Sequence, residues 1–237
     1  IYYSEILQCF LEHKQERKII FSSKNLEYRF KSGTIGLHSF TFSVPSGNLV
    51  GIMGGSGAGK STLLNVLNGS ENPSKGNVTI NGINLHAEKK KAEGIIGNIP
   101  QDDLLIEDLT VYQNLFYNTK LCFGELNDEE INKRVSSTLE SLGLTETKNL
   151  RVGNVLNKTI SGGQRKRLNI ALELIREPSI LFVDEPTSGL SSRDAENVMD
   201  LLKHLSNSGK LVFVVIHQPS SDVFRMFDKL LLLDTGG

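Results

Sequence analysis

The sequence of 237 residues lacks the features of disulfide-rich, membrane-spanning and nucleic-acid-binding chains. Its two cysteines, Cys9 and Cys122, lie far apart and form no C-x-x-C spacing, so neither a disulfide framework nor a zinc site is predicted and a reducing compartment is expected. The longest apolar runs, residues 211–216 and 230–233, are far shorter than the roughly 20 residues that cross a bilayer. The 26 Lys and Arg nearly balance the 27 Asp and Glu. This balance argues against a protein whose surface as a whole attracts nucleic acid.

Internal repeats and low-complexity tracts are also absent, and 38% hydrophobic with 22% charged residues is typical of a globular chain. The length fits one large domain, or one domain with a lobe. The chain starts without Met, and residues 234–237 resemble a turn that awaits another strand. We therefore expect an excised piece of a longer protein.

The first 18 residues differ from the rest in pattern. Apolar side chains at positions 3, 6, 7 and 10 have helical spacing, and a mostly charged stretch follows over residues 12–18. We predict an amphipathic lead-in helix or linker over residues 1–18. Packing on the edge of the domain is favoured over a membrane-surface role.

From residue 19 the pattern predicts short strands and then a nucleotide-binding core. The strands are expected at residues 19–21, 25–30, 37–44, 48–53 and 76–82, with a Gly-rich loop and a helix over residues 61–68 after the fourth. The first three look antiparallel. Strand, loop and helix in this order are typical of an α/β core that holds a nucleotide.

The middle of the chain, residues 104–156, is predicted to be a helical lobe. Apolar residues from Ile131 to Leu142 recur on one helical face behind a capping box formed by Asn127 and Glu130.

From residue 161 helices and strands alternate. Helices are expected over residues 164–176, 192–207 and 220–227, and strands over residues 180–184, 211–217 and 229–234. Alternation of this kind predicts right-handed βαβ units in a parallel sheet. The predicted fold is thus α/β, with a parallel sheet, an antiparallel N-terminal part and a helical lobe over about residues 102–160.

A phosphate-binding loop is the most specific motif. The segment between the predicted strand and helix matches G-x-x-x-x-G-K-[ST] and reads Gly54-Gly55-Ser56-Gly57-Ala58-Gly59-Lys60-Ser61. Its glycines let backbone N–H groups point into one concavity, and the next helix adds its positive N-terminus. We expect Lys60 to reach the β- and γ-phosphates, Ser61 to offer a hydroxyl to Mg²⁺, and Thr62 to contribute to nucleotide binding.

Two carboxylates end a predicted strand that is otherwise fully apolar. Asp184 and Glu185 follow the sequence Ile-Leu-Phe-Val, where uncompensated charge would be costly unless a cation or substrate meets it. Asp184 suits a metal. Strand alternation predicts that Glu185 points the other way, where it can act as general base for a water in line with the γ-phosphate.

A second glycine motif opens a later helix. It reads Ser161-Gly162-Gly163-Gln164 and is followed by Arg165, Lys166 and Arg167. Alone it could be an N-cap with turn residues, and the basic run could be a nucleic-acid patch. Together with the elements above it reads as a second phosphate-facing helix N-terminus, although one nucleotide cannot easily use both glycine sites of one subunit.

These elements, with a Gln near the middle and a late His, occur in the order found in ABC ATPases. The chain resembles an ABC nucleotide-binding domain from about residue 19 to its end. The wording at residues 99–103, 109–111, 160–167 and 216–220 resembles the ABCG (White, or eye-pigment) subfamily and its bacterial relatives.

The resemblance implies an ATPase that uses Mg²⁺ and works as a head-to-tail dimer. Each ATP would lie between the phosphate-binding loop (Walker A loop) of one subunit and residues 161–164 of the other. Gln101 would contact Mg²⁺ and the attacking water, and His217 would hold the γ-phosphate. An aromatic ring near the loop would stack on adenine; Phe30 lies 30 residues before Lys60, and Tyr28 is its rival.

The resemblance further implies a transmembrane domain as partner, C-terminal in the same polypeptide, and a location at the cytoplasmic face of a membrane. ABC proteins of chromosomes should carry heptads between Gln101 and Ser161, which are absent, and ribosomal members carry two cassettes. A P-loop kinase or GTPase offers no role for residues 161–164.

One residue departs from the family pattern. Ser191 stands where the family usually has Asp, and it keeps the ability to cap the next helix but lacks the charge. Communication between the ATP sites, or the hydrolysis rate, is expected to be reduced. Ser191→Asp is then expected to raise the activity.

Overall fold

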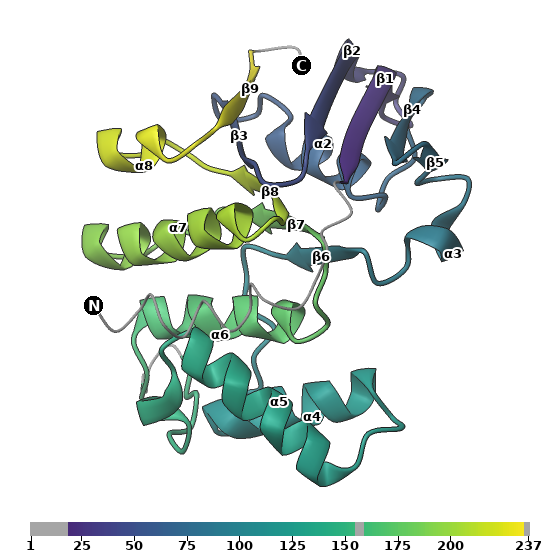
Figure 1. The fold of residues 1–237 in the computed structure, drawn as a ribbon. Helices are drawn as coiled ribbons and strands as arrows, with labels where there is room; N and C mark the ends of the chain where they lie inside the picture. The colour runs from purple at the N-terminus through teal and green to yellow at the C-terminus, as the bar shows by residue number, and fades with distance from the viewer. Residues whose placement is uncertain (1–18, 155–158, 235–237) are drawn as a thin grey trace.

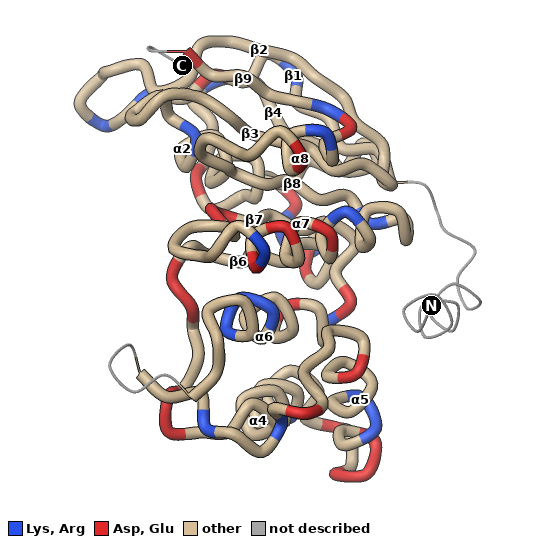
Figure 2. The backbone as a smooth tube through the Cα atoms, turned by 90° about the vertical axis from the view of Figure 1, so that its left-hand side faces the viewer, with Lys and Arg blue, Asp and Glu red and all other residues tan. Residues whose placement is uncertain are grey.

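The structure is a computed structural model that describes residues 19–154 and 159–234. The predicted lead-in helix over residues 1–18 and the last three residues of the predicted terminal turn lie outside them. Two β-sheets occupy the upper half of Figure 1 and a helical lobe occupies the lower half. Acidic and basic residues are interspersed along the chain (Figure 2).

An antiparallel sheet has the strand order β2-β1-β4-β5. Its members are β1 (Ile20–Arg29), β2 (Ile35–Pro45), β4 (Lys75–Ile80) and β5 (Ile83–Asn84). The prediction of two strands over the region of β1 was wrong, because the polar residues between them form a bulge and not a turn. Pairing with β2 shifts register between Ser23 and Leu26, and Asn25 between them has φ of 48°.

A parallel sheet has the order β6-β7-β8-β3-β9 (Figure 1). Its strands are β6 (Ile96–Ile99), β7 (Ile180–Asp184), β8 (Leu211–Val215), β3 (Leu49–Gly54) and β9 (Lys229–Leu233). The predicted parallel sheet is confirmed. The four residues of β6 include Gly and Asn, and they carry no strand signal in the sequence.

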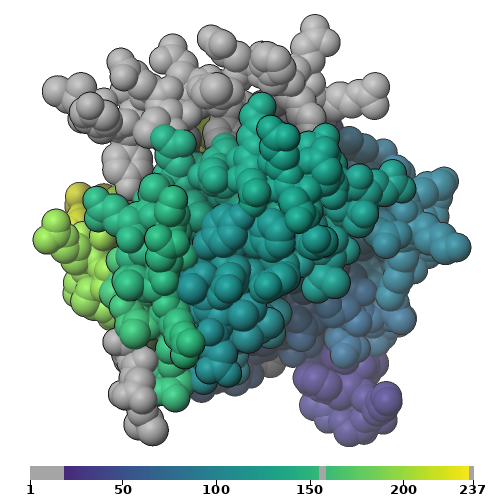
Figure 3. Space-filling model, turned by 90° about the horizontal axis from the view of Figure 1, so that it is seen from below, coloured from purple at the N-terminus to yellow at the C-terminus, as the bar shows by residue number. Residues whose placement is uncertain are grey.

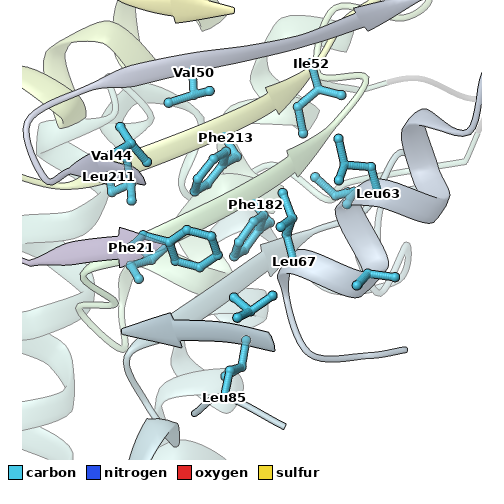
Figure 4. Packing of buried hydrophobic residues seen from close by; sticks show 14 of the residues in the cluster. Phe21, Val44, Val50, Ile52, Leu63, Leu67, Leu85, Phe182, Leu211 and Phe213 are labelled. Carbon is cyan, nitrogen blue, oxygen red and sulfur yellow. The ribbon is translucent and has the colours of Figure 1, made fainter. Parts of the chain in front are cut away.

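Helices cover both faces of the parallel sheet. The helices of the sheet region are α2 (Lys60–Leu67), α3 (Lys89–Ala92), α6 (Gly162–Leu174), α7 (Ser192–Asn207) and α8 (Ser221–Arg225). On one face α2 and the antiparallel sheet enclose a core in which the rings of Phe182 and Phe213 stack 4.9 Å apart, with Phe21 beside them (Figure 4). On the other face residues of α6, α7 and α8 pack against the alternate side chains of the same strands.

The helical lobe has its own hydrophobic core. It contains α4 (Val111–Cys122) and α5 (Asp128–Ser141), which pack against α6, and a 3-10 turn, η1 (Thr145–Thr147), which contacts α5. The predicted capping box of Asn127 and Glu130 is confirmed at the start of α5. The lobe faces the viewer in teal and green in Figure 3. No helix in the described part of the chain is both long and apolar enough to cross a membrane.

Candidate nucleotide site

The phosphate loop leaves β3 at Gly54 and enters α2 at Lys60. Gly57 and Gly59 have φ of 77° and 89°, a region that residues with a Cβ rarely adopt. A Cβ on Gly54 would lie 2.4 Å from the carbonyl oxygen of Leu233 in β9. The loop therefore requires glycine for close packing at its start and for backbone conformation at its end.

No side chain caps the N-terminus of α2. Its N-cap residue is Gly59, which has no side-chain acceptor to offer. The loop residues Gly55, Ser56 and Gly57 are exposed in front of it, as is Ser61, while Thr62 is half-buried. Backbone N–H groups at an uncapped helix N-terminus, together with the positive end of the helix dipole, make a binding site for an anion such as phosphate.

Lys60 lies within the loop and not in solvent, since only 7% of the residue is exposed. Its Nζ donates hydrogen bonds to the carbonyl oxygens of Gly54 at 3.0 Å and Gly55 at 2.8 Å. An ammonium has three donors, so these two bonds hold the group in place and leave one donor for a phosphate oxygen. The cation is thus fixed before any nucleotide binds.

Asp184 ends β7, which pairs with β8. On its other side β8 pairs with β3, the strand that leads to the phosphate loop. Burial raises the pKa of its carboxyl, and the charge of Glu185 raises it further, while Lys166 and Lys60 oppose the rise. The carboxyl group is therefore close enough to both lysines to sense their charge. A carboxylate in this setting is stabilised by a further cation.

Glu185 does not continue the alternation of β7, so the expected reason for its direction was wrong. Its backbone has φ of 43°, a left-handed conformation that is unfavourable for a residue with a side chain. Its N–H still donates to the carbonyl oxygen of Val215 in β8 at 3.0 Å. The chain thus turns sharply at Glu185 itself, directly after Asp184, and this turn sets the direction of the Glu185 side chain.

The strand order brings four separate motifs to one edge of the parallel sheet. Parallel strands place their carboxyl ends together, and β6, β7, β8 and β3 are neighbours. The segments that follow them contain Gln101, Glu185, His217 and the phosphate loop, respectively. Gln101 and His217 are exposed. Open α/β sheets bind ligands at this edge.

The segment after β6 is anchored by hydrogen bonds to α6. Arg165 forms two hydrogen bonds with the carboxylate of Asp103, at 2.9 and 3.0 Å. Lys166 donates from Nζ to the carbonyl oxygen of Gln101, and Asn169 accepts from the N–H of Leu104 at 3.3 Å. Burial lowers the pKa of Lys166, while nearby carboxylates oppose the change. The basic run of α6, blue in Figure 2, therefore anchors the segment that carries Gln101.

These contacts could not be predicted from the sequence, in which Arg165 and Lys166 are part of a basic run and Asp103 has no recognisable role. The charge pattern was visible, but Asp103 and Arg165 are 62 positions apart, and only the packing of α6 against the segment pairs them.

Ser161 begins α6 with a closed cap. Its hydroxyl accepts from the N–H of Gln164 at 3.2 Å, and Gln164 Oε1 accepts from the N–H of Ser161 at 2.7 Å. Gly162 and Gly163 lie between them. Residues of α2 and α6 belong to the cores on opposite faces of the parallel sheet, so the two glycine motifs do not form one site in this chain.

The two candidate aromatic residues differ in their surroundings. Phe30 is 44% exposed, and a Cβ on Gly36 would lie 2.8 Å from its ring. The carbonyl oxygen of Gly36 would in turn lie 3.1 Å from a Cβ on Gly59, so Gly36 joins the ring to the phosphate loop. Tyr28 packs edge-on against Phe30 and donates from its hydroxyl to Glu71 at 3.4 Å. Phe30 is therefore the freer of the two rings.

A profile described as ABC transporter matches residues 37–188, which is more than half of the chain. The chain belongs to the ABC transporter family. Among similar solved structures is the dimeric bacterial ABC transporter cassette MJ0796, with a TM-score of 0.76 and 31% identity over 91% of this chain and 95% of that one. A post-hydrolysis form of the same cassette, bound to ADP and Pi, has a TM-score of 0.75.

Several relatives of this ABC domain are named as members of the G family. ABC-type transporter claG of Penicillium crustosum is 44% identical over 81% of this chain and 26% of that protein. ABC transporter G family member 13 of Arabidopsis thaliana is 43% identical over 79% and 28%. ATP-binding cassette sub-family G member 8 of Rattus norvegicus is 35% identical over 86% and 30%. The ABC domain is thus ABCG-like, and it spans less than a third of the length of these relatives.

The D-loop of the ABC domain, residues 186–191, connects Glu185 to α7. Its last residue, Ser191, caps α7, as its hydroxyl accepts from the N–H of Asp194 at 3.2 Å. Within the loop, the N–H of Ser188 donates to the carbonyl oxygen of Glu185 at 3.2 Å. Ser191 therefore keeps the capping role that the sequence predicted.

Proposed function

We propose that this domain binds ATP with Mg²⁺, hydrolyses it to ADP and phosphate within a head-to-tail dimer, and so powers transport through a membrane partner. The observation that carries the proposal is the edge of the parallel sheet. There an uncapped helix N-terminus with a fixed ammonium follows β3, two strands away from β7, which ends at Asp184 with Glu185 directly after it.

Mg²⁺ fits the oxygen donors that the chain offers. Ser61 provides a hydroxyl, Asp184 a carboxylate and Gln101 an amide oxygen, and Mg²⁺ usually takes one or two such ligands together with phosphate oxygens. The pKa of the Asp184 carboxyl is raised, and a nearby divalent cation would lower it. When bound, the ion would neutralise charge that develops on the phosphates.

The remaining steps fall to the chain's own groups. The N–H groups of the phosphate loop and Lys60 bind the β- and γ-phosphates, and Phe30 stacks on adenine. Glu185 orients the attacking water and accepts its proton, with Gln101 beside that water. His217 donates to the γ-phosphate. Positioning and charge neutralisation account for most of the rate in such reactions.

The second glycine motif explains why a dimer is proposed. Ser161 Oγ accepts one hydrogen bond within the cap, so its own proton remains available for a γ-phosphate. The motif lies on the other face of the sheet from α2, so that phosphate would belong to a partner subunit. MJ0796, which the chain resembles over nine tenths of its length, was solved as a dimer.

Transport is proposed from the relatives. Those that the chain matches are named as transporters and are more than three times as long as the matched region. We propose a transmembrane domain in the same polypeptide, C-terminal to this domain, which would place the domain at the cytoplasmic face of a membrane.

The decisive test is Glu185→Gln in the intact protein. We expect ATP binding to stay within about twofold and hydrolysis to fall by about a hundredfold or more, since a carboxamide cannot accept the proton. ATP should then accumulate in a dimer that size-exclusion chromatography detects. Glu125→Gln, which changes an exposed carboxylate of the helical lobe, is the matched control. Hydrolysis at the parent rate by the Glu185 variant would remove Glu185 from the mechanism.

A further inference from the structure

A carboxylate lies beside Ser191, where the resemblance leads one to expect Asp. The hydroxyl of Ser191 donates to Oδ2 of Asp194 at 2.9 Å, besides accepting from the N–H of Asp194. Asp194 is in the first turn of α7 and is half-buried. A negative charge is therefore present at the end of the D-loop, but it comes from a residue three positions further on.

The other oxygen of Asp194 faces the first turn of α6. A Cβ on Gly163 would lie 2.6 Å from Oδ1 and 3.0 Å from Cγ, so the carboxylate occupies the space that a side chain at position 163 would need. Leu190 has the same relation to Gly162, where a Cβ would lie 3.0 Å from Leu190 Cδ2. Both glycines of the second glycine motif thus lie against residues that follow β7.

A short hydrogen-bonded segment joins these contacts to Glu185. The N–H of Ser188 bonds to the carbonyl oxygen of Glu185, and the N–H of Leu190 bonds to that of Thr187 at 3.3 Å. A change in backbone position at Glu185 therefore reaches α6 through packed and hydrogen-bonded groups. Such contiguous groups carry coupling between sites when both sites bias them.

We infer that Asp194 is a positioning residue that couples the two ATP sites of the dimer, and that it supplies the charge that Ser191 lacks. The inference rests on the proposed function, in which Glu185 serves the ATP of its own subunit and residues 161–164 serve the ATP of the partner. Through Asp194, a change at the ATP site of one subunit alters the N-terminus of its α6, which completes the ATP site of the partner.

This assignment reverses the effect expected of Ser191→Asp. The substitution would remove the hydroxyl that donates to Asp194 and place a second carboxylate within hydrogen-bond distance of the first. Two carboxylates that close repel each other. We therefore expect the substitution to lower the ATPase activity, and we expect the exchange Ser191→Asp with Asp194→Ser to preserve it.

The test compares four variants of the intact protein: Asp194→Ser, Ser191→Asp, the exchange that combines both, and Asp200→Ser. Asp200 is an exposed carboxylate on the same helix and serves as the matched control. ATPase rate is measured against ATP concentration, ATP affinity is measured on the monomer, and the melting temperature reports stability.

For Asp194→Ser we expect about a tenfold loss of rate and a Hill coefficient that falls from about 2 to about 1, with monomer affinity within about twofold. The exchange should recover the rate to within about threefold and recover the Hill coefficient. A role in stability alone would change the melting temperature and not the Hill coefficient.

Three results would overturn the inference: parent rate and cooperativity in Asp194→Ser, no recovery in a folded exchange variant, or an equal loss in Asp200→Ser. Failure of the proposed function looks different. In that case the protein with Glu185→Gln would not dimerise with ATP and the unaltered protein would not hydrolyse it, and the inference about Asp194 would fall with the proposal.

Discussion

Two helix N-termini in this molecule lie at glycine motifs, yet their capping is opposite. At α2 the N-cap is Gly59 and no side chain accepts from the first turn. At α6 the N-cap is Ser161, and its hydroxyl and the side chain of Gln164 close a full capping box. At α2 the first backbone N–H groups therefore have no side-chain acceptor, whereas at α6 two backbone N–H groups already have one.

The two helices are also anchored differently. The loop before α2 is packed against β9 and holds its own lysine. The first turns of α6 instead hold the segment with Gln101, through Arg165 and Lys166, and they contact Asp194. Under the proposed function, α2 would bind nucleotide on its own, whereas α6 would respond to the state of the surrounding loops.

Lys60→Ala should remove nucleotide binding at α2. The ammonium is the only cation that the loop sequence contains, and a charge-assisted bond to phosphate is among the stronger polar contacts. We expect ATP affinity to fall by about a hundredfold or more and hydrolysis to become undetectable. An ATP titration measures the first. Lys90→Ala, at an exposed position of α3, should leave both unchanged; unaltered affinity in a folded Lys60 variant would contradict the assignment of the loop.

Ser161→Ala should distinguish the role of the α6 N-terminus from that of the α2 N-terminus. It removes the cap and the hydroxyl that α6 would offer to a partner's ATP, at a cost of about 1 kcal/mol in stability. ATP binding to the monomer should be unchanged, while hydrolysis falls by about tenfold or more because the dimer is impaired.

Asn127→Ala is the control for capping alone. Asn127 forms the same type of capping box at the start of α5, and it has no proposed role at either ATP site. Its substitution should cost similar stability in thermal unfolding without changing hydrolysis. Equal ATPase losses in the two variants would show that Ser161 acts only as a cap.

The smallest expected effect concerns the link between α6 and the segment with Gln101. A double-mutant cycle with Asp103→Ala and Arg165→Ala should give a coupling of about 1–2 kcal/mol in denaturant unfolding, because the pair is bidentate and its side chains are only 25% and 13% exposed. The same cycle on Lys120 and Asp128, whose side chains are 53% and 65% exposed, should give less than about 0.5 kcal/mol. Similar values for both pairs would refute a fixed link.

Several elements were predictable from the sequence because their signals are local. The strand over 180–184 and the helix over 192–207 have the predicted bounds, since an apolar run and a Ser cap mark them within a few residues. The capping box of Asn127 and Glu130 was likewise predictable, because the two residues are only three positions apart. By contrast, β6 was missed, and the bulge at Asn25 was taken for a break between two strands.

The chemical groups of this protein, and their order along the chain, follow from its amino-acid sequence. Glycine, lysine and carboxylate motifs act through short spacing, so they identify an ABC ATPase domain before any packing is known. Which of these groups meet follows from the tertiary structure. Strand order brings Gln101, Glu185 and His217 to one sheet edge, and helix packing sets Asp194 against Gly163, because contacts across tens of residues depend on how the elements pack and not on the local chain.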